Sequence, residues 1–199
     1  MTYQEALEYL DTFVDYERTP QPAAMRTGQL ERMRRLCRRL GEPQRAFRSI
    51  LVAGTNAKGS ISAMLYAMLR ASSLRVGLYT SPHLEEFRER IRVSPHRLPP
   101  RPSGPSSHGA AGWEPQANAV DDDRISETEF AALIEEIRTA IEASGDWTPR
   151  EEPLTYFEVL TAVAFLQFQR RQVDVAVVEV GLGGRLDATN VLDAAVAVF

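Results

Sequence analysis

The sequence has 199 residues, of which 44% are hydrophobic and 25% are charged, and its 23 Lys+Arg against 27 Asp+Glu give a formal net charge of −4. These values are typical of a folded globular protein, and the acidic balance argues against nucleic-acid binding, which needs a basic face. The single cysteine, Cys37, excludes an internal disulfide and a cysteine-rich zinc module and favours a reducing compartment. Acidic residues near the N-terminus argue against a signal peptide, and no apolar run reaches the roughly 20 residues that span a bilayer, so we expect a cytoplasmic protein.

The first eighty residues follow an alternation of helix and strand patterns. Apolar residues recur at helical spacing in the first forty residues, which predicts two helices, the second ending at Gly41. Two short apolar runs, 49–53 and 75–80, then flank a helical pattern over 61–69. A strand, a loop, a helix and a second strand in this order form the unit of a parallel sheet, so the sequence predicts an α/β fold.

Residues 95–123 differ in composition from the rest of the chain. They hold six of the twelve prolines and three glycines, and they show almost no apolar period. This composition predicts a flexible surface insertion rather than a second domain.

The last part of the chain returns to regular patterns. Ser126 and Thr155 each precede a glutamate by three residues, the capping-box spacing that starts a helix. Near-continuous valine and alanine over 173–180 predict a strand covered on both faces, and 194–199 predicts the start of another buried strand. Because a buried strand needs further covering elements, we interpret the sequence as the N-terminal piece of a longer protein.

The loop after the first predicted strand carries residue types that bind a phosphate chain. Such a chain requires inward-turned backbone N–H groups, the positive end of a helix and a compact cation, which Lys58 supplies. The candidate loop consists of Gly54, Thr55, Asn56, Ala57, Lys58, Gly59 and Ser60. Its spacing departs from G-x-x-x-x-G-K-[ST], and a solvated turn between strand and helix is the alternative interpretation.

Two side chains stand at the carboxyl ends of predicted strands, where open α/β sheets bind ligands. Glu179, at the end of the predicted strand 173–180, is suited to bind Mg²⁺; the alternative is a surface glutamate. Ser81 directly follows the predicted strand 75–80; the alternative there is a turn fixed by Pro82. The glycine-rich run 181–184 is not a dinucleotide fingerprint, because the polar residues 187–190 follow it instead of an apolar helix.

Three strings occur in a fixed order, namely LVAGTNAKGS, GLYTSPHLEEFRERIRV and TYFEVLTAVAFLQF…VDVAVVEVGLGGRLDATNV. Together they resemble the folylpolyglutamate synthase/dihydrofolate synthase family, a branch of the Mur ligase group of ATP-dependent amide-forming enzymes. The resemblance covers nearly the whole chain except 95–123. It implies a three-layer, P-loop-type parallel sheet with flanking helices, like the central domain of Mur ligases. It also implies that residues 1–199 are an incomplete N-terminal ATP-binding domain, from which a C-terminal glutamate ligase domain is absent.

The activity implied by the resemblance is an ATP- and Mg²⁺-dependent ligase that adds L-glutamate to dihydropteroate or to a reduced folate through an acyl phosphate. The implied partners are these small molecules alone, without nucleic acid or membrane, and the implied state is a monomer. The family's further metal-binding histidine and its carbamylated lysine have no counterpart in the sequence. We therefore expect no glutamate ligation by this chain alone.

Matching the family's motifs position by position assigns roles to individual residues. Lys58 and Glu179 correspond to catalytic residues within the ATP loop and the metal site, and Ser81 joins Glu179 as a Mg²⁺ ligand. The residues that match the pteridine site are Thr155, Tyr156, Phe157, Glu158, Leu186, Asp187 and Ala188. Ala57 replaces a glycine that is usual in the family. A Cβ there costs roughly 1–2 kcal/mol if φ is positive, so we expect Ala57 to weaken ATP binding modestly.

Two alternatives stay open at the level of the sequence. The first is a peptidoglycan Mur ligase that shares the ATP chemistry, although TYFE and SPHLEEFRERI resemble the folate branch more closely. The second is a truncated nucleotide-binding module without catalysis. The sequence does not decide between dihydropteroate and folate as the acceptor.

Overall fold

A computed structural model describes residues 1–16, 28–72, 74–95, 122–143 and 153–199 of the chain. Most of the predicted insertion, 96–121, lies outside these ranges. The sheet has five strands in the order β3-β2-β4-β1-β5. Their bounds are β1 Arg48–Val52, β2 Val76–Tyr79, β3 Ile91–Val93, β4 Val175–Glu179 and β5 Val196–Val198.

The sheet is parallel except for β3, which pairs antiparallel with β2. The sequence predicted a parallel sheet and missed β3, because its three residues follow the 3-10 turn Phe87–Arg90 and are too short to show a strand period. In the register, Val52 of β1 and Tyr79 of β2 pair with Glu179 and Val178 of β4. The carboxyl ends of three parallel strands therefore meet at one edge.

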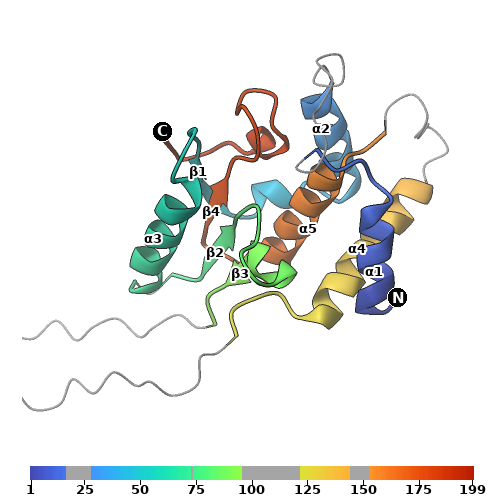
Figure 1. Cartoon of the computed structure of the whole chain (residues 1–199), viewed down its shortest axis with the longest axis horizontal. Helices are drawn as coiled ribbons and strands as arrows, with labels where there is room; N and C mark the ends of the chain where they lie inside the picture. Colours follow the sequence, from blue (N-terminus) through green and yellow to red (C-terminus); the bar gives the residue numbers. More distant parts are fainter. Residues whose placement is uncertain (17–27, 73, 96–121, 144–152) are drawn as a thin grey trace, which may run out of the picture.

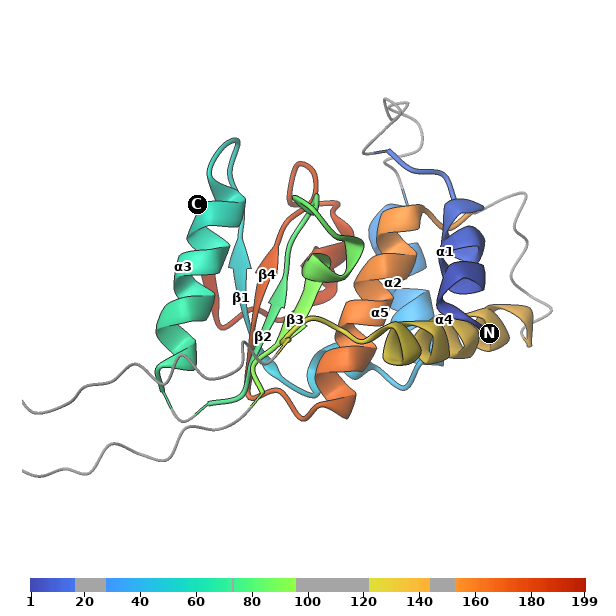
Figure 2. The same cartoon turned by 60° about the horizontal axis from the view of Figure 1, so that its bottom comes forward.

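Helices cover both faces of the sheet, which confirms the three-layer α/β prediction (Figure 1). The helix α3, Lys58–Arg70, lies on one face, and Val175 and Val177 of β4 pack in the cluster beneath it. The other face carries Ala176 and Val178 and faces the helix α5, Tyr156–Arg170, which is buried along most of its length (Figure 2). The remaining helices on that side are α1 Tyr3–Asp11, α2 Gln29–Arg39 and α4 Glu127–Glu142. Within the described ranges, no helix is long and apolar enough to cross a membrane.

The predicted capping boxes start α4 and α5. Ser126 accepts a hydrogen bond from the Glu129 backbone N–H, and Thr155 accepts one from that of Glu158. Both glutamate side chains reach back to the backbone N–H of the capping residue. The Tyr156 backbone N–H also donates to the Val14 carbonyl at 3.0 Å, which ties the segment after α1 to the start of α5.

One prediction about the chain was confirmed and another was wrong. The predicted last strand is β5, which pairs with β1, and within the described residues its Val196 is 51% exposed. Asp123, placed in the flexible insertion, is only 7% exposed and accepts hydrogen bonds from Tyr66, Arg70 and Arg92. The ordered chain therefore resumes before Ser126, because this carboxylate binds side chains far away in the sequence.

Candidate functional site

The predicted metal ligands lie together at the carboxyl edge of the sheet. Glu179 is the last residue of β4 and is 4% exposed. Its Oε2 accepts a hydrogen bond from the Ser81 backbone N–H at 3.3 Å. A Cβ built on Gly59 would lie 3.7 Å from the same oxygen. The structure thus brings the ends of β2 and β4 to the first turn of α3.

The loop from Gly54 to Ala57 is exposed, and α3 begins at Lys58. Ala57 caps the helix with φ 60° and ψ 8°, and its carbonyl accepts a hydrogen bond from the Ile61 N–H at 2.9 Å. A residue with a Cβ is destabilised in this left-handed conformation. The cost of roughly 1–2 kcal/mol expected for a positive φ therefore applies to Ala57. Lys58 is the only lysine among the 199 residues. The compact ammonium group therefore stands at the helix terminus, where free backbone N–H groups favour an anion.

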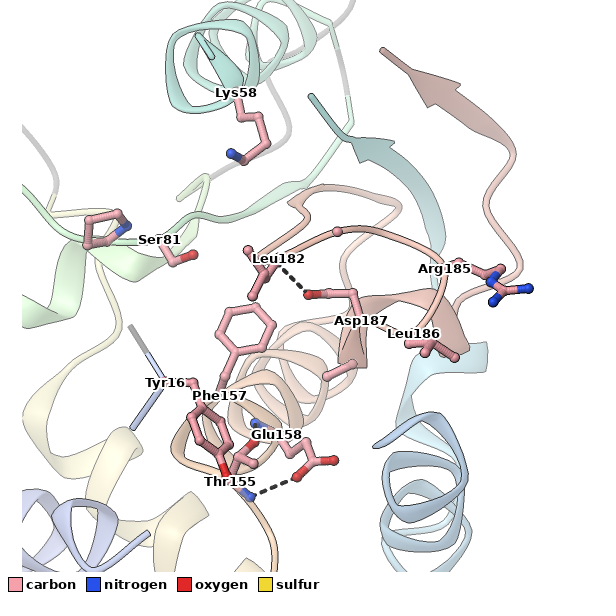
Figure 3. A pocket seen from close by; sticks show the side chains of 14 residues that line it. Tyr16, Lys58, Ser81, Thr155, Phe157, Glu158, Leu182, Arg185, Leu186 and Asp187 are labelled. Atoms are coloured by element: carbon pink, nitrogen blue, oxygen red, sulfur yellow. Dashed lines mark hydrogen bonds between the residues drawn. The ribbon is translucent and has the colours of Figure 1, made fainter. Parts of the chain in front are cut away.

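A cavity of about 540 Å³ opens beside Lys58 and Ser81 (Figure 3). Lys58 points into it from the start of α3, while Thr155, Phe157 and Glu158 come from the start of α5 on the opposite side. The loop after β4 forms a third wall. The full lining is Tyr16, Lys58, Ser81, Pro82, Thr155, Phe157, Glu158, Gly181, Leu182, Gly183, Arg185, Leu186, Asp187 and Ala188.

The ring of Phe157 lies at the base of this cavity. Its centroid is 5.8 Å from that of Tyr79, with an angle of 32° between the rings. A Cβ on Gly181 would lie 2.6 Å from Phe157 Cζ, closer than real Cβ atoms approach other heavy atoms. Gly181 therefore makes room for the ring, which presents an apolar, aromatic surface to a ligand.

Glu158 places a buried carboxylate in the wall of the cavity. Oε2 accepts a hydrogen bond from the Thr155 N–H at 2.7 Å, and Oε1 lies 3.3 Å from Nε of Arg32 on α2. Within the described residues, neither Oε1 nor this Nε has a hydrogen bond of good geometry. Burial raises the pKa of Glu158, while Arg32 and the bonds from Thr155 act in the opposite direction.

Asp187 is the second buried carboxylate of the cavity. It accepts hydrogen bonds from the Leu182 N–H at 2.9 Å and from the backbone and hydroxyl of Thr189 at 2.9 and 2.6 Å. These bonds close the loop after β4 and cap the 3-10 turn Ala188–Val191. Burial raises the pKa of Asp187, and the hydrogen bonds offset part of that effect.

The structure brings most of the predicted site residues together. Among the seven residues matched to the pteridine site, Tyr156 alone does not line the cavity; it is buried, with Arg90 5.9 Å from its ring centre. Gly54–Ala57, Gly59 and Ser60 border Lys58 without lining this cavity. Sequence reasoning did not predict six of the lining residues, nor Arg32 as the partner of Glu158; the six are Tyr16, Pro82, Gly181, Leu182, Gly183 and Arg185. The sequence offered a signal for Pro82 and for the four residues of the loop after β4, because they belong to the quoted SPHLEEFRERI and GLGGRLDATNV strings.

Within the described residues, no three His, Cys, Asp or Glu side chains gather into a group that could hold a metal ion by themselves. Glu179 and Ser81 offer one carboxylate and one hydroxyl group. This pair fits Mg²⁺ bound together with substrate phosphates, which commonly uses one or two carboxylates.

Comparison with known proteins gives relatives of one kind, although no protein-family model matches the chain. Folylpolyglutamate synthase of Lacticaseibacillus casei is 34% identical over 199 residues, covering 100% of this chain and 38% of that protein. The dihydrofolate synthase/folylpolyglutamate synthase of Mycobacterium tuberculosis is 40% identical over 170 residues, covering 85% of this chain and 30% of that protein. A solved FPGS–AMPPCP–folate complex has a TM-score of 0.75 at 34% identity, over 99% of this chain and 39% of that one.

The chain spans less than two fifths of the length of each of these proteins. The similarity in sequence and fold extends over nearly all of the chain's own length. The homologues and structural neighbours of the chain are thus folylpolyglutamate synthases and dihydrofolate synthases of the Mur ligase superfamily, and the chain matches the N-terminal portion of these larger proteins.

Proposed function

We propose that the chain is the ATP- and acceptor-binding part of a ligase that adds L-glutamate to dihydropteroate or to a reduced folate. The observation that carries the proposal is the single cavity that holds Lys58 at one side and Thr155, Phe157 and Glu158 at the other. A structural neighbour that covers the same elements was solved with AMPPCP, an ATP analogue, and folate.

The phosphate side of the site supports nucleotide binding. The free N–H groups at the start of α3 and the Lys58 ammonium would bind the β- and γ-phosphates and stabilise the charge that develops on the transferred phosphoryl oxygens. The buried Glu179 carboxylate and the Ser81 hydroxyl would hold Mg²⁺, since oxygen ligands at the edge of a phosphate loop are what this ion prefers. Bound there, Mg²⁺ would supply neutralisation of the phosphate charge.

The side of the cavity opposite Lys58 suits a flat ring that has polar edges and apolar faces. Phe157 and Tyr16 offer aromatic surface, and Thr155, Glu158 and Asp187 add polar groups to the wall. Such a placement directs the acceptor's carboxylate toward Lys58. Its oxygen attacks the γ-phosphorus of ATP and releases ADP; the glutamate amine then attacks the acyl phosphate and forms the amide, with loss of phosphate and a proton.

The division of labour in the whole protein is part of the proposal. Residues 1–199 form one ATP-binding domain of the Mur ligase central type, and the glutamate-binding part lies in the portion of the relatives that this chain does not match. The proposed assay therefore measures substrate binding, and we expect no glutamate ligation by this chain alone.

The test is calorimetric titration of the purified chain with Mg·AMPPCP and, separately, with dihydropteroate. Both are expected to bind, Lys58→Met to lose the nucleotide alone, and Phe157→Ala to lose the pteroate alone. Absence of nucleotide binding, or preference for a UDP-linked peptidoglycan precursor over the pteroate, would contradict the proposal.

A further inference from the structure

A buried ion pair joins α2 to α5 directly behind the acceptor side of the cavity. Arg32 is 6% exposed and Glu158 is 1% exposed, and Arg32 Nε lies 3.3 Å from Glu158 Oε1. Glu158 lines the cavity and Arg32 does not. Nη1 of Arg32 lies 3.5 Å from the point where a Cβ on Gly28 would stand, so the guanidinium packs against the start of its own helix. Arg32 therefore meets the wall of the cavity through Glu158.

A buried carboxylate without a cation nearby takes up a proton, because the interior solvates its charge poorly. Glu158 has one such cation, and the capping box fixes one of its oxygens: Oε2 is held by the Thr155 N–H. The other oxygen, Oε1, is buried beside Arg32 Nε and has no hydrogen bond of good geometry within the described residues. The pair is thus arranged to hold the carboxylate ionised and in one orientation behind the wall of the cavity.

We infer that Arg32 is a positioning residue of the acceptor site, which holds the Glu158 carboxylate ionised within the capping box and so fixes the start of α5, where Thr155 and Phe157 line the cavity. The identity of the acceptor rests on the proposed function. The ionised state of Glu158 does not depend on that proposal. An experiment can therefore contradict the role of Arg32 without contradicting the proposed function, and the reverse.

Other charged or titratable groups line the same cavity, and a change at any of them could also alter the titration of Glu158. They come from α3, from the segment after α1 and from the loop after β4, and they are Lys58, Tyr16, Arg185 and Asp187. Arg32 is the charged side chain whose electrostatic effect on Glu158 opposes burial. Its removal should therefore change the titration of Glu158 more than any change at the mouth of the cavity.

The first experiment follows the Glu158 carboxyl carbon by NMR in the ¹³C-glutamate-labelled chain, without ligand. The resonance is assigned as the one that disappears in Glu158→Gln. Arg32→Met is expected to raise the titration midpoint by at least about one pH unit, and Arg32→Lys, which keeps the charge, by less than about half a unit. The control is Arg38→Met on the same helix, where the arginine is 54% exposed and pairs with Glu31. An unchanged midpoint in folded Arg32→Met would overturn the inference.

The second experiment is a double-mutant cycle on dihydropteroate affinity at neutral pH. Arg32→Met is expected to weaken binding about tenfold in the wild-type background and less than about twofold in Glu158→Gln, because a residue that acts through Glu158 has nothing left to position. An equal loss in both backgrounds would show that Arg32 acts on its own and would contradict the inference.

Circular dichroism decides whether Arg32→Met folds. If it does not, the cycle is run with Arg32→Lys, which keeps the charge and loses the planar guanidinium, with an expected loss of about threefold that vanishes in Glu158→Gln. If the wild-type chain does not bind dihydropteroate, the proposed function fails, and the NMR titration of Glu158 still tests the ion pair.

Discussion

The proposed nucleotide site, next to the cavity, is made mostly of exposed backbone, whereas the proposed acceptor side of the cavity is made of buried side chains. Gly54–Ala57 are exposed, and the phosphate binding proposed for them depends on their backbone conformation and on the Lys58 that follows. Glu158 and Asp187 are buried and held by partners from other segments, and both have raised pKa values because of burial. The proposed nucleotide site thus depends on the conformation of one short segment, whereas the proposed acceptor side depends on contacts between segments far apart in the sequence.

This difference has a physical reason. A triphosphate carries its own charge and needs N–H donors and one compact cation, which a loop and a helix start supply within seven residues. A neutral ring needs a shaped surface and a few fixed hydrogen-bond groups, which no single segment provides. Substitutions on the two sides should therefore separate nucleotide binding from acceptor binding.

The largest expected effect is at Lys58. Both Lys58→Met and Lys58→Arg should weaken Mg·AMPPCP binding at least about tenfold, since the guanidinium does not replace a compact point charge at a phosphate loop. Pteroate binding should stay the same. The control is Arg34→Lys, an exposed position. Titration calorimetry of all three variants gives the result, and an equal loss of both ligands in Lys58→Met would erase the proposed separation.

The next effect is expected at Gly181. Gly181→Ala puts a Cβ 2.6 Å from Phe157 Cζ and should push the ring into the cavity, weakening pteroate binding about tenfold, in line with an overpacking cost of 1–3 kcal/mol. In a Phe157→Leu background the same change should have little further effect, because the ring it meets is gone. Fluorescence titration of the four proteins tests this, and additive losses would contradict it.

A smaller effect is expected at Ala57. Ala57→Gly should raise the free energy of unfolding by about 0.5–1 kcal/mol, because relief of the left-handed strain exceeds the added entropy of the unfolded chain. Nucleotide affinity should rise a few fold. Ala63→Gly, the same change at an exposed position inside α3, should instead destabilise by about 1 kcal/mol. Urea denaturation distinguishes the two, and unchanged or weaker nucleotide binding in Ala57→Gly would refute the role of the methyl group.

The smallest effect concerns pH. Because burial raises the pKa of Glu158 above its ordinary 4.5, the unfolded chain loses this proton first as the pH rises. The contribution of Glu158 to stability is therefore present below about pH 4.5 and falls until the folded group also ionises. Glu158→Gln removes that slope, so its stability relative to the wild type should increase with pH above 4.5. Denaturant midpoints at several pH values measure this, and a relative decrease would have the wrong sign.

The same contrast explains what the sequence could predict. The strand–loop–helix pattern located the candidate phosphate loop before α3, and the capping spacing located Thr155 and Glu158 at the start of α5, because both signals are local. The φ of Ala57 was considered beforehand only as a condition, since backbone conformation in a loop follows from the folded context. Tyr156, assigned to the pocket with its neighbours, faces the protein interior because adjacent helical positions point in different directions.

Long-range contacts were out of reach. Arg32 is 126 positions before Glu158, and no period or motif links them, yet they form one buried pair. Asp123 likewise binds Tyr66 and Arg70 across more than 50 positions.

The most direct test of the central claim is a crystal structure of the chain with Mg·AMPPCP and dihydropteroate. The account predicts the phosphates at Lys58 and the start of α3, Mg²⁺ in contact with Glu179 and Ser81, and the pterin ring against Phe157 with its carboxylate facing the γ-phosphate. A nucleotide bound on another face, or a pteroate outside this cavity, would contradict it.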